Sequence, residues 1–95
     1  MDVKEVPCSL PECRNSASYK IAAPWNDDRF SGLRTYGFAC FDHLGCVLRS
    51  SEVRWLAYEP VPEETVLELG IYGFEPGKLD SQLVRDRAVE ESLRF

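Results

Sequence analysis

Cysteine and histidine residues in two short clusters constrain this 95-residue chain more than any other feature. Cys8 and Cys13 form a Cys-x4-Cys pair, and after 26 intervening residues Cys40, His43 and Cys46 form a Cys-x2-His-x2-Cys group. A structural zinc site takes four sulfur or nitrogen ligands in a tetrahedron, and a short-spaced pair supplies two corners from one local turn. A metal site that cross-links the chain also adds much to the stability of a domain this short, because such a domain buries only a modest core. The two clusters therefore predict a zinc site of the Cys3His type.

Helix geometry selects the ligands of the second cluster. Apolar residues at positions 41, 44, 47 and 48 predict a short amphipathic helix over residues 40–52, with Asp42 in its first turn. On such a helix, Cys40 and Cys46 lie about 9 Å apart along the axis and about 120° apart around it. Two thiolates on one zinc lie within about 4 Å of each other, so only one of these cysteines can join the site.

We assign the zinc to Cys8, Cys13, Cys40 and His43, and leave Cys46 as the surplus thiol. Cys40 is preferred because it ends a predicted strand whose alternating face includes Tyr36 and Phe38. A pair made of His43 and Cys46 is the alternative, since those residues are also three positions apart. The cysteines could instead fill the core as small apolar thiols, or hold an iron–sulfur cluster, although such a cluster usually takes four cysteines.

The first half of the chain predicts a β-hairpin before this helix. Tyr19 and Ile21 alternate with polar neighbours in "SASYKIAA", which indicates a strand with one buried face. The segment "PWNDDRFSG" predicts a loop, and "LRTYGFAC" predicts a second, antiparallel strand. The turn-forming segment "PCSLPECR" holds Cys8 and Cys13 ahead of the hairpin.

The second half predicts further strands and a final helix. The segment "VRWLAYE" favours a strand, with continuation of the preceding helix as the alternative. We predict a strand over "TVLELGIYG", with Leu67, Leu69 and Ile71 on one face. "EPGK" predicts a type II turn with positive φ at Gly77. Asp80 is expected to cap a helix over residues 81–95, whose weak apolar face we assign to three side chains: Leu83, Val84 and Ala88.

These elements define an α+β fold class in one zinc-stapled domain spanning residues 1–95. Residues 7–50 form the zinc-binding core of knuckle, β-hairpin and short helix. Residues 51–79 form a β-rich extension, and residues 80–95 form a C-terminal helix, part of which could be disordered. No internal repeat divides the chain.

The order of elements around Cys8, Cys13, Cys40 and His43 resembles the treble-clef zinc fingers, and more loosely the zinc ribbons. The resemblance covers residues 7–50 and implies a zinc knuckle, a β-hairpin and a helix whose first turn supplies the last two ligands. The segment "CSLPEC" departs from the family knuckle, which is typically Cys-x2-Cys with a glycine. Treble clefs bind nucleic acids, proteins and lipids and include some enzymes, so the resemblance does not choose a function.

Charge and composition narrow the possible partners. The chain has 11 basic and 16 acidic residues, a net charge of −5, and no run of lysine and arginine. Nucleic-acid and anionic-membrane binding both require basic surfaces, so we expect a protein partner instead. No segment has the apolar length of a signal peptide or a membrane span, so we expect a cytoplasmic, monomeric protein.

The functional prediction is a non-catalytic zinc module that acts through protein contacts. Four protein ligands would close the zinc site, the single histidine would be a ligand, and no nucleophile triad or phosphate loop is present. Glu63 and Glu64 are interpreted as a solvated surface. The expected contact surfaces are residues 24–34, where Trp25 and Phe30 lie, and the acidic second half.

The sequence leaves two alternative functions open. A nucleic-acid-associated zinc finger would need a local basic face, for which the candidates share the less acidic half of the chain: Arg14, Lys20, Arg29 and Arg34. A thiol redox protein would use Cys46 as its reactive group.

Overall fold

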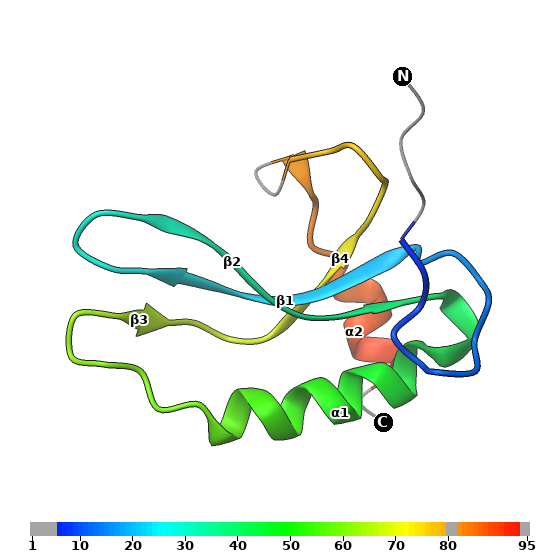
Figure 1. The fold of residues 1–95 in the computed structure, drawn as a ribbon, viewed down its shortest axis with the longest axis horizontal. Coiled ribbons are helices and arrows are strands. Elements are labelled where there is room, and N and C mark those ends of the chain that lie inside the picture. Colours follow the sequence, from blue (N-terminus) through cyan, green and yellow to red (C-terminus); the bar gives the residue numbers. More distant parts are fainter. Residues whose placement is uncertain (1–5, 80–81, 94–95) are drawn as a thin grey trace.

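The structure, a computed structural model, describes residues 6–79 and 82–93. As predicted, the fold is α+β: a four-stranded antiparallel sheet is accompanied by two helices (Figure 1). In chain order the elements are β1 (Tyr19–Asn26), β2 (Ser31–Ala39), the 3-10 helix η1 (Phe41–His43), α1 (Leu44–Ala57), β3 (Thr65–Val66), β4 (Gly70–Gly73) and α2 (Arg87–Leu93).

Strand β1 is the centre of the sheet. It pairs with β2 along one side and with β3 and β4 along the other. Ile21, Ala22 and Ala23 have no exposed surface, so consecutive residues are buried on both faces of this strand. The prediction of a strand with one buried face is therefore wrong, because neighbouring elements cover β1 on both sides.

The β1–β2 connection is shorter than predicted. Pro24, Trp25 and Asn26 belong to β1, and β2 already begins at Ser31. The side chain of Asp27 closes the turn, since its Oδ1 accepts hydrogen bonds from the backbone N–H groups of Arg29 (2.8 Å) and Phe30 (2.6 Å). These bonds lower the pKa of Asp27, because they stabilise its ionised form.

The single strand predicted over residues 65–73 is two short strands, β3 and β4. Trp25 pairs with Val66, whereas Ala22 pairs with Gly70, so residues 66–70 contain one residue more than the opposing part of β1. Pro24 lies opposite this interruption, where it accepts a hydrogen bond from the N–H of Leu67 but has no N–H to donate. The break leaves Leu67 half exposed, whereas Leu69 and Ile71 are buried. The prediction that all three share one buried face is therefore wrong for Leu67.

Helix α1 packs on β2 through the buried side chains of Leu44, Val47 and Leu48. The helix continues to Ala57, so within the undecided residues 51–59 the strand favoured for "VRWLAYE" is wrong, and the alternative of a continued helix is correct as far as Ala57. The predicted apolar position Phe41 is instead 71% exposed, because it lies in η1, ahead of α1. Gly37 permits the close approach of α1, since a Cβ atom there would lie 2.8 Å from Cγ1 of Val47.

The C-terminal segment differs from its prediction mainly in where the helix begins. The turn after β4 forms as expected, with φ of 90° at Gly77. Asp80, the predicted cap, lies outside the described residues. Helix α2 starts at Arg87 and is capped by Asp86, whose Oδ1 accepts the N–H of Val89 at 3.1 Å.

The apolar face predicted for this helix is also wrong. Val84 is 76% exposed and precedes the helix together with Leu83, while Ala88 is exposed within it. Val89 and Leu93 pack against the core instead. The later start of the helix shifts the register of its inward face.

Candidate metal centre

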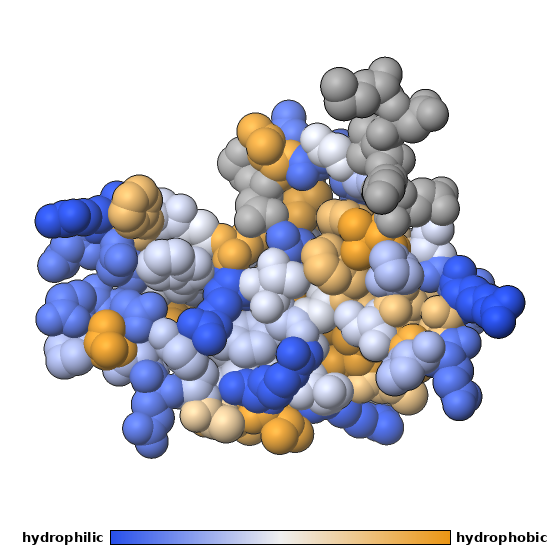
Figure 2. Space-filling model, in the orientation of Figure 1, coloured by the Kyte–Doolittle hydropathy of each residue, from blue (hydrophilic) through white to orange (hydrophobic). Residues whose placement is uncertain are grey.

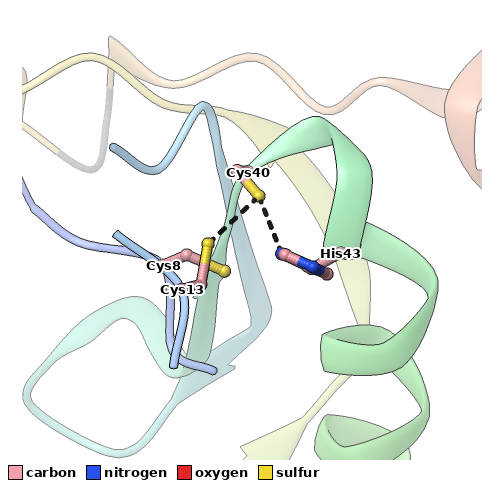
Figure 3. A group of neighbouring side chains, drawn as sticks. All are labelled: Cys8, Cys13, Cys40 and His43. Atoms are coloured by element: carbon pink, nitrogen blue, oxygen red, sulfur yellow. Dashed lines mark hydrogen bonds between the residues drawn. The ribbon is translucent and has the colours of Figure 1, made fainter. Parts of the chain in front are cut away.

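Four ligand atoms meet at the junction of the N-terminal loop, β2 and η1 (Figure 3). The sulfur atoms of Cys8, Cys13 and Cys40 and a ring nitrogen of His43 all lie within 4.8 Å of one another. Cys8 and Cys40 are buried, and Cys13 and His43 are partly buried. The structure therefore brings together the four residues that the sequence spacing singled out, from segments more than two dozen positions apart.

Backbone hydrogen bonds form the loop that carries Cys8 and Cys13. The N–H of Cys8 donates to the carbonyl of Asn15 at 3.0 Å, and the N–H of Cys13 donates to the carbonyl of Leu10 at 3.0 Å. The first bond closes the loop and the second makes a tight turn within it. Both cysteines are thereby held on one compact loop, despite the four residues between them.

Ser9 attaches this loop to the end of β2. Its N–H donates to the carbonyl of Phe38 at 2.8 Å, and its hydroxyl accepts the N–H of Phe38 at 2.9 Å. Ser9 follows Cys8 directly, and Phe38 lies two residues before Cys40. This pair of bonds therefore sets the distance between the two halves of the cluster.

The second pair of ligands comes from a 3-10 turn, where the sequence predicted the first turn of an α-helix. Cys40 is extended and precedes η1, while His43 is its last residue and donates its N–H to the Cys40 carbonyl at 3.3 Å. Side chains three positions apart eclipse each other in a 3-10 helix. This geometry places Sγ of Cys40 3.2 Å from Nδ1 of His43.

The contacts of Cys40 with Cys13 and His43 are close to the ligand spacing of a tetrahedral metal. Bonds of about 2.3 Å to sulfur and about 2.0 Å to nitrogen put the ligand atoms about 3.5–3.8 Å apart around zinc. The Cys13 and Cys40 sulfurs are 3.7 Å apart, and the Cys40–His43 contact is slightly shorter than the ideal. The group is thus positioned to bind a metal ion, and its three sulfurs and one imidazole are a donor set typical of zinc.

The two neighbouring thiols Cys13 and Cys40 differ in acidity. Burial would raise the pKa of Cys40, but hydrogen bonds from the Asn15 amide and from the backbone and ring of His43 outweigh it and lower the pKa to about 6. The backbone of Asn15 acts to lower the pKa of Cys13, yet burial and the adjacent thiols raise it overall. Of these two thiols Cys40 is the more acidic, and a cysteine binds a metal as its thiolate.

Asn15 is a residue of the site that sequence reasoning missed. Its Nδ2 lies 3.7 Å from Sγ of Cys40, and its carbonyl closes the Cys8 loop. Groups that hydrogen-bond to metal ligands orient them and tune their basicity. The available signal was a polar side chain two positions after Cys13.

Cys46 lies outside the cluster. It is exposed on α1 and does not belong to the group of four ligand atoms. Asp42 is also exposed, in the first turn of η1. Of the two acids interpreted as a solvated surface, Glu64 accepts the Tyr58 hydroxyl at 2.7 Å, and Glu63 is exposed.

The candidates for a basic face are not all available to a ligand. Lys20 is only 7% exposed, with its ammonium 5.8 Å from the centre of the Phe38 ring. The guanidinium of Arg34 lies 3.7 Å from the centre of the Tyr58 ring. Arg14 and Arg29 are exposed.

The comparisons with known proteins add no family to this description: no family model, curated protein or solved structure matches the chain. In the described part of the chain, no helix combines the length and apolar character needed to cross a membrane.

Proposed function

We propose that this protein is a non-catalytic, zinc-stapled module of the treble-clef type that acts through contacts with another protein. The observation that carries the zinc assignment is the convergence of three sulfurs and one imidazole nitrogen within 4.8 Å. The zinc would join the N-terminal loop to the β2–η1 junction. Its binding free energy would then contribute directly to folding.

The number of ligands supports a structural role. Catalytic zinc sites keep one position open for water or substrate, whereas four protein ligands close the tetrahedron. The same four residues include the only histidine of the chain. Hydrogen bonds from Asn15 and the partial burial of the cluster also favour a permanent ion over an exchangeable one.

Charge supports a protein partner over a nucleic acid. The net charge is −5, and one of the four residues proposed for a basic face, Lys20, is buried. Apolar side chains are available for a protein contact instead. Figure 2 shows apolar groups along the edge formed by α1, where Val53 and Leu56 are 68% and 74% exposed.

Metal analysis with matched cysteine variants tests the proposal. Purified protein should contain about one zinc per chain. The double variant Cys8→Ser, Cys13→Ser should lose the metal and the cooperative thermal transition, because it removes half of the ligands. Cys46→Ser is the control, because it makes the same change outside the cluster, and it should keep both the metal and the cooperative thermal transition.

Three results would contradict the zinc assignment: full folding of the double variant, no effect of a chelator on the wild type, or loss of zinc in Cys46→Ser. The partner is tested separately by capture from the source cell with zinc-loaded protein. Binding to DNA or RNA that weakens steeply with salt would replace the protein partner by a nucleic acid.

A further inference from the structure

A positively charged cleft between α1 and β2 is not explained by the metal centre. Two hollows of about 440 and 310 Å³ lie along this junction, and both are lined by Tyr36 and Arg54. The first reaches Ser9 on the loop between the two N-terminal cysteines, and the second reaches Arg34 and Tyr58. We refer to the two together as the α1–β2 cleft.

The cleft is basic although the protein is acidic. No acidic residue of the described ranges 6–79 and 82–93 lines either hollow, whereas Arg34 and Arg54 both do. Neither arginine belongs to the ion pairs found within residues 6–79 and 82–93, which are Lys78–Glu75, Arg85–Glu68 and Arg85–Glu90. Glu64 accepts the Tyr58 hydroxyl and, through the same carboxylate oxygen, the N–H of Val61.

Both guanidinium groups are held in place by uncharged partners. The Cζ atom of Arg34 is 3.7 Å from the centre of the Tyr58 ring and 5.8 Å from that of Tyr36. Arg54 donates through Nη2 to the backbone carbonyl of Tyr36. These contacts restrict the side chains without neutralising them, so less conformational entropy is lost when an anion binds.

The hydroxyl of Tyr36 gives an independent indication of a ligand. Tyr36 is 7% exposed, and its buried oxygen has no hydrogen-bond partner among the described residues. Buried polar atoms in native proteins are almost always satisfied, so each exception requires an explanation. Tyr36 lines both hollows, and a ligand oxygen that reached its hydroxyl would satisfy this donor.

The position of Tyr36 follows from an irregularity in the sheet. Ile21 pairs with Gly37 and Ala22 pairs with Thr35, so Tyr36 is the extra residue of a β-bulge in β2. Bulges redirect side chains and are frequent beside binding sites. Here the bulge accompanies a tyrosine that lines a hollow together with Val47 of α1.

We propose that the α1–β2 cleft binds oxyanion groups, carboxylate or phosphate, on an acidic segment of a partner protein. Guanidinium groups bind both anions through paired hydrogen bonds, and the tyrosine hydroxyl adds a neutral donor. This inference rests on the proposed function and names one part of the protein contact. The larger hollow of about 620 Å³ is also lined in part by α1, but there Arg49 is accompanied by Glu52 and Glu68, so it has no preference for anions.

Peptide binding to the zinc-loaded full chain tests the cleft. The probes are fluorescein-labelled oligoglutamate and oligoglutamine, with inorganic phosphate as a competitor, measured by anisotropy at low and high salt. Oligoglutamate should bind saturably and less tightly at high salt, and oligoglutamine should not bind. Arg34→Gln and Arg54→Gln should each weaken binding about tenfold or more, because each removes a charge-assisted hydrogen bond.

Matched variants separate the site from general electrostatics. Arg49→Gln makes the same charge change on α1 outside the cleft and should alter the affinity less than about twofold. Tyr36→Phe removes only the hydroxyl and should weaken binding about threefold or more. Nitrogen-15 NMR signals of the Arg34 and Arg54 side chains should shift during the titration. Displacement of the peptide by phosphate at lower concentration than by free glutamate would identify a phosphorylated segment as the preferred form.

Three outcomes would contradict anion binding by the cleft: no binding of oligoglutamate, equal binding of oligoglutamine, or equal losses of affinity in Arg49→Gln and Arg54→Gln. Tighter binding of a single-stranded oligonucleotide at the same arginines would assign the cleft to nucleic acid instead. Zinc content is measured on every sample. If the Arg34→Gln, Arg54→Gln double variant has normal zinc content and captures the partner as well as the wild type does, only the cleft proposal is rejected. If the wild type contains no zinc, the proposed function is rejected.

Discussion

Ser51 is a buried polar residue on α1 for which the fold provides no partner among the described residues. It has no exposed surface, and its hydroxyl makes no hydrogen bond with them. An unsatisfied buried hydroxyl costs about 1–3 kcal/mol. Ser51→Ala should therefore raise the free energy of unfolding, measured by chemical denaturation of the zinc-loaded protein.

Its neighbour Ser50, which is exposed, provides the control. Replacing serine by alanine raises helix propensity by about 0.5 kcal/mol at either position. The gain in the free energy of unfolding should therefore be about 1 kcal/mol larger for Ser51→Ala than for Ser50→Ala. A loss of stability in Ser51→Ala would mean that the hydroxyl is satisfied in solution, for example by a buried water molecule.

At the level of single residues, spacing predicted the metal cluster because ligand chemistry acts over short distances along the chain. Cys40 and His43 needed only one turn to come together. Asn15 was missed because its role depends on the path of the loop around Cys8 and Cys13, which spacing does not describe. Phe41 was misplaced because one turn of 3-10 helix shifts the rotational position of every residue around it.

The packing of α1 on β2 depends on a glycine. A Cβ atom at Gly37 would lie 2.8 Å from Cγ1 of Val47 and 3.1 Å from the hydroxyl of Ser51, both of which are side-chain atoms in the helix interface. Gly37→Ala should lower the free energy of unfolding by about 1–3 kcal/mol through overpacking.

Gly32 is the matched control in the same strand. A Cβ atom there would have only Nε1 of Trp25 nearby, at 4.0 Å, so Gly32→Ala should change stability little. In the Val47→Ala background, Gly37→Ala should be less destabilising than in the wild type, because the clashing methyl groups of Val47 are gone. Equal losses of stability in Gly37→Ala and Gly32→Ala would show that the backbone conformation of glycine, and not the close approach of α1, accounts for the effect at Gly37.

Glu90 of α2 forms an ion pair with Arg85 and a hydrogen bond with β4, and its side chain has little exposure. Glu90 is 6% exposed, and its two oxygens accept hydrogen bonds from Arg85 at 2.7 and 2.8 Å. The N–H of Ile71 also donates to Glu90, at 3.2 Å. In Glu90→Gln the amide nitrogen would face one of these donors, so stability should fall by about 2–4 kcal/mol.

Glu91→Gln, one position further along α2, removes the same charge at an exposed site and should cost little. Equilibrium denaturation of the two variants makes the comparison. Similar stabilities would show that solvent reaches Glu90 and screens the pair.

Among the elements, the hairpin and both helices could be predicted, but their limits could not. The residues before Ser31 looked like a loop because proline, asparagine and aspartate favour turns, yet pairing with β2 and β3 continues β1 to Asn26. The division of residues 65–73 depends on the missing N–H of Pro24, which lies on a strand distant in sequence. The late start of α2 follows from Asp86, which caps the helix six residues after the predicted cap Asp80.

For the molecule as a whole, the candidate metal centre lies where the core elements meet. Cys40 connects β2 to η1 and α1, and the buried cluster that contains Cys8 and Cys40 also includes Ile21, Leu44 and Ile71. Metal removal should therefore affect more than the N-terminal loop. Without the ion, the buried thiols at this junction lose the group that offsets the cost of ordering them.

Hydrogen exchange before and after chelation tests this coupling. We expect amide protection to fall in β1, β2 and α1 as well as in residues 6–16, and to return when zinc is added. Cys46→Ser should behave as the wild type, because its thiol is exposed and outside the cluster. Loss of protection confined to residues 6–16 would mean that zinc only fastens the loop, and that the sheet and α1 are stable through their apolar core alone.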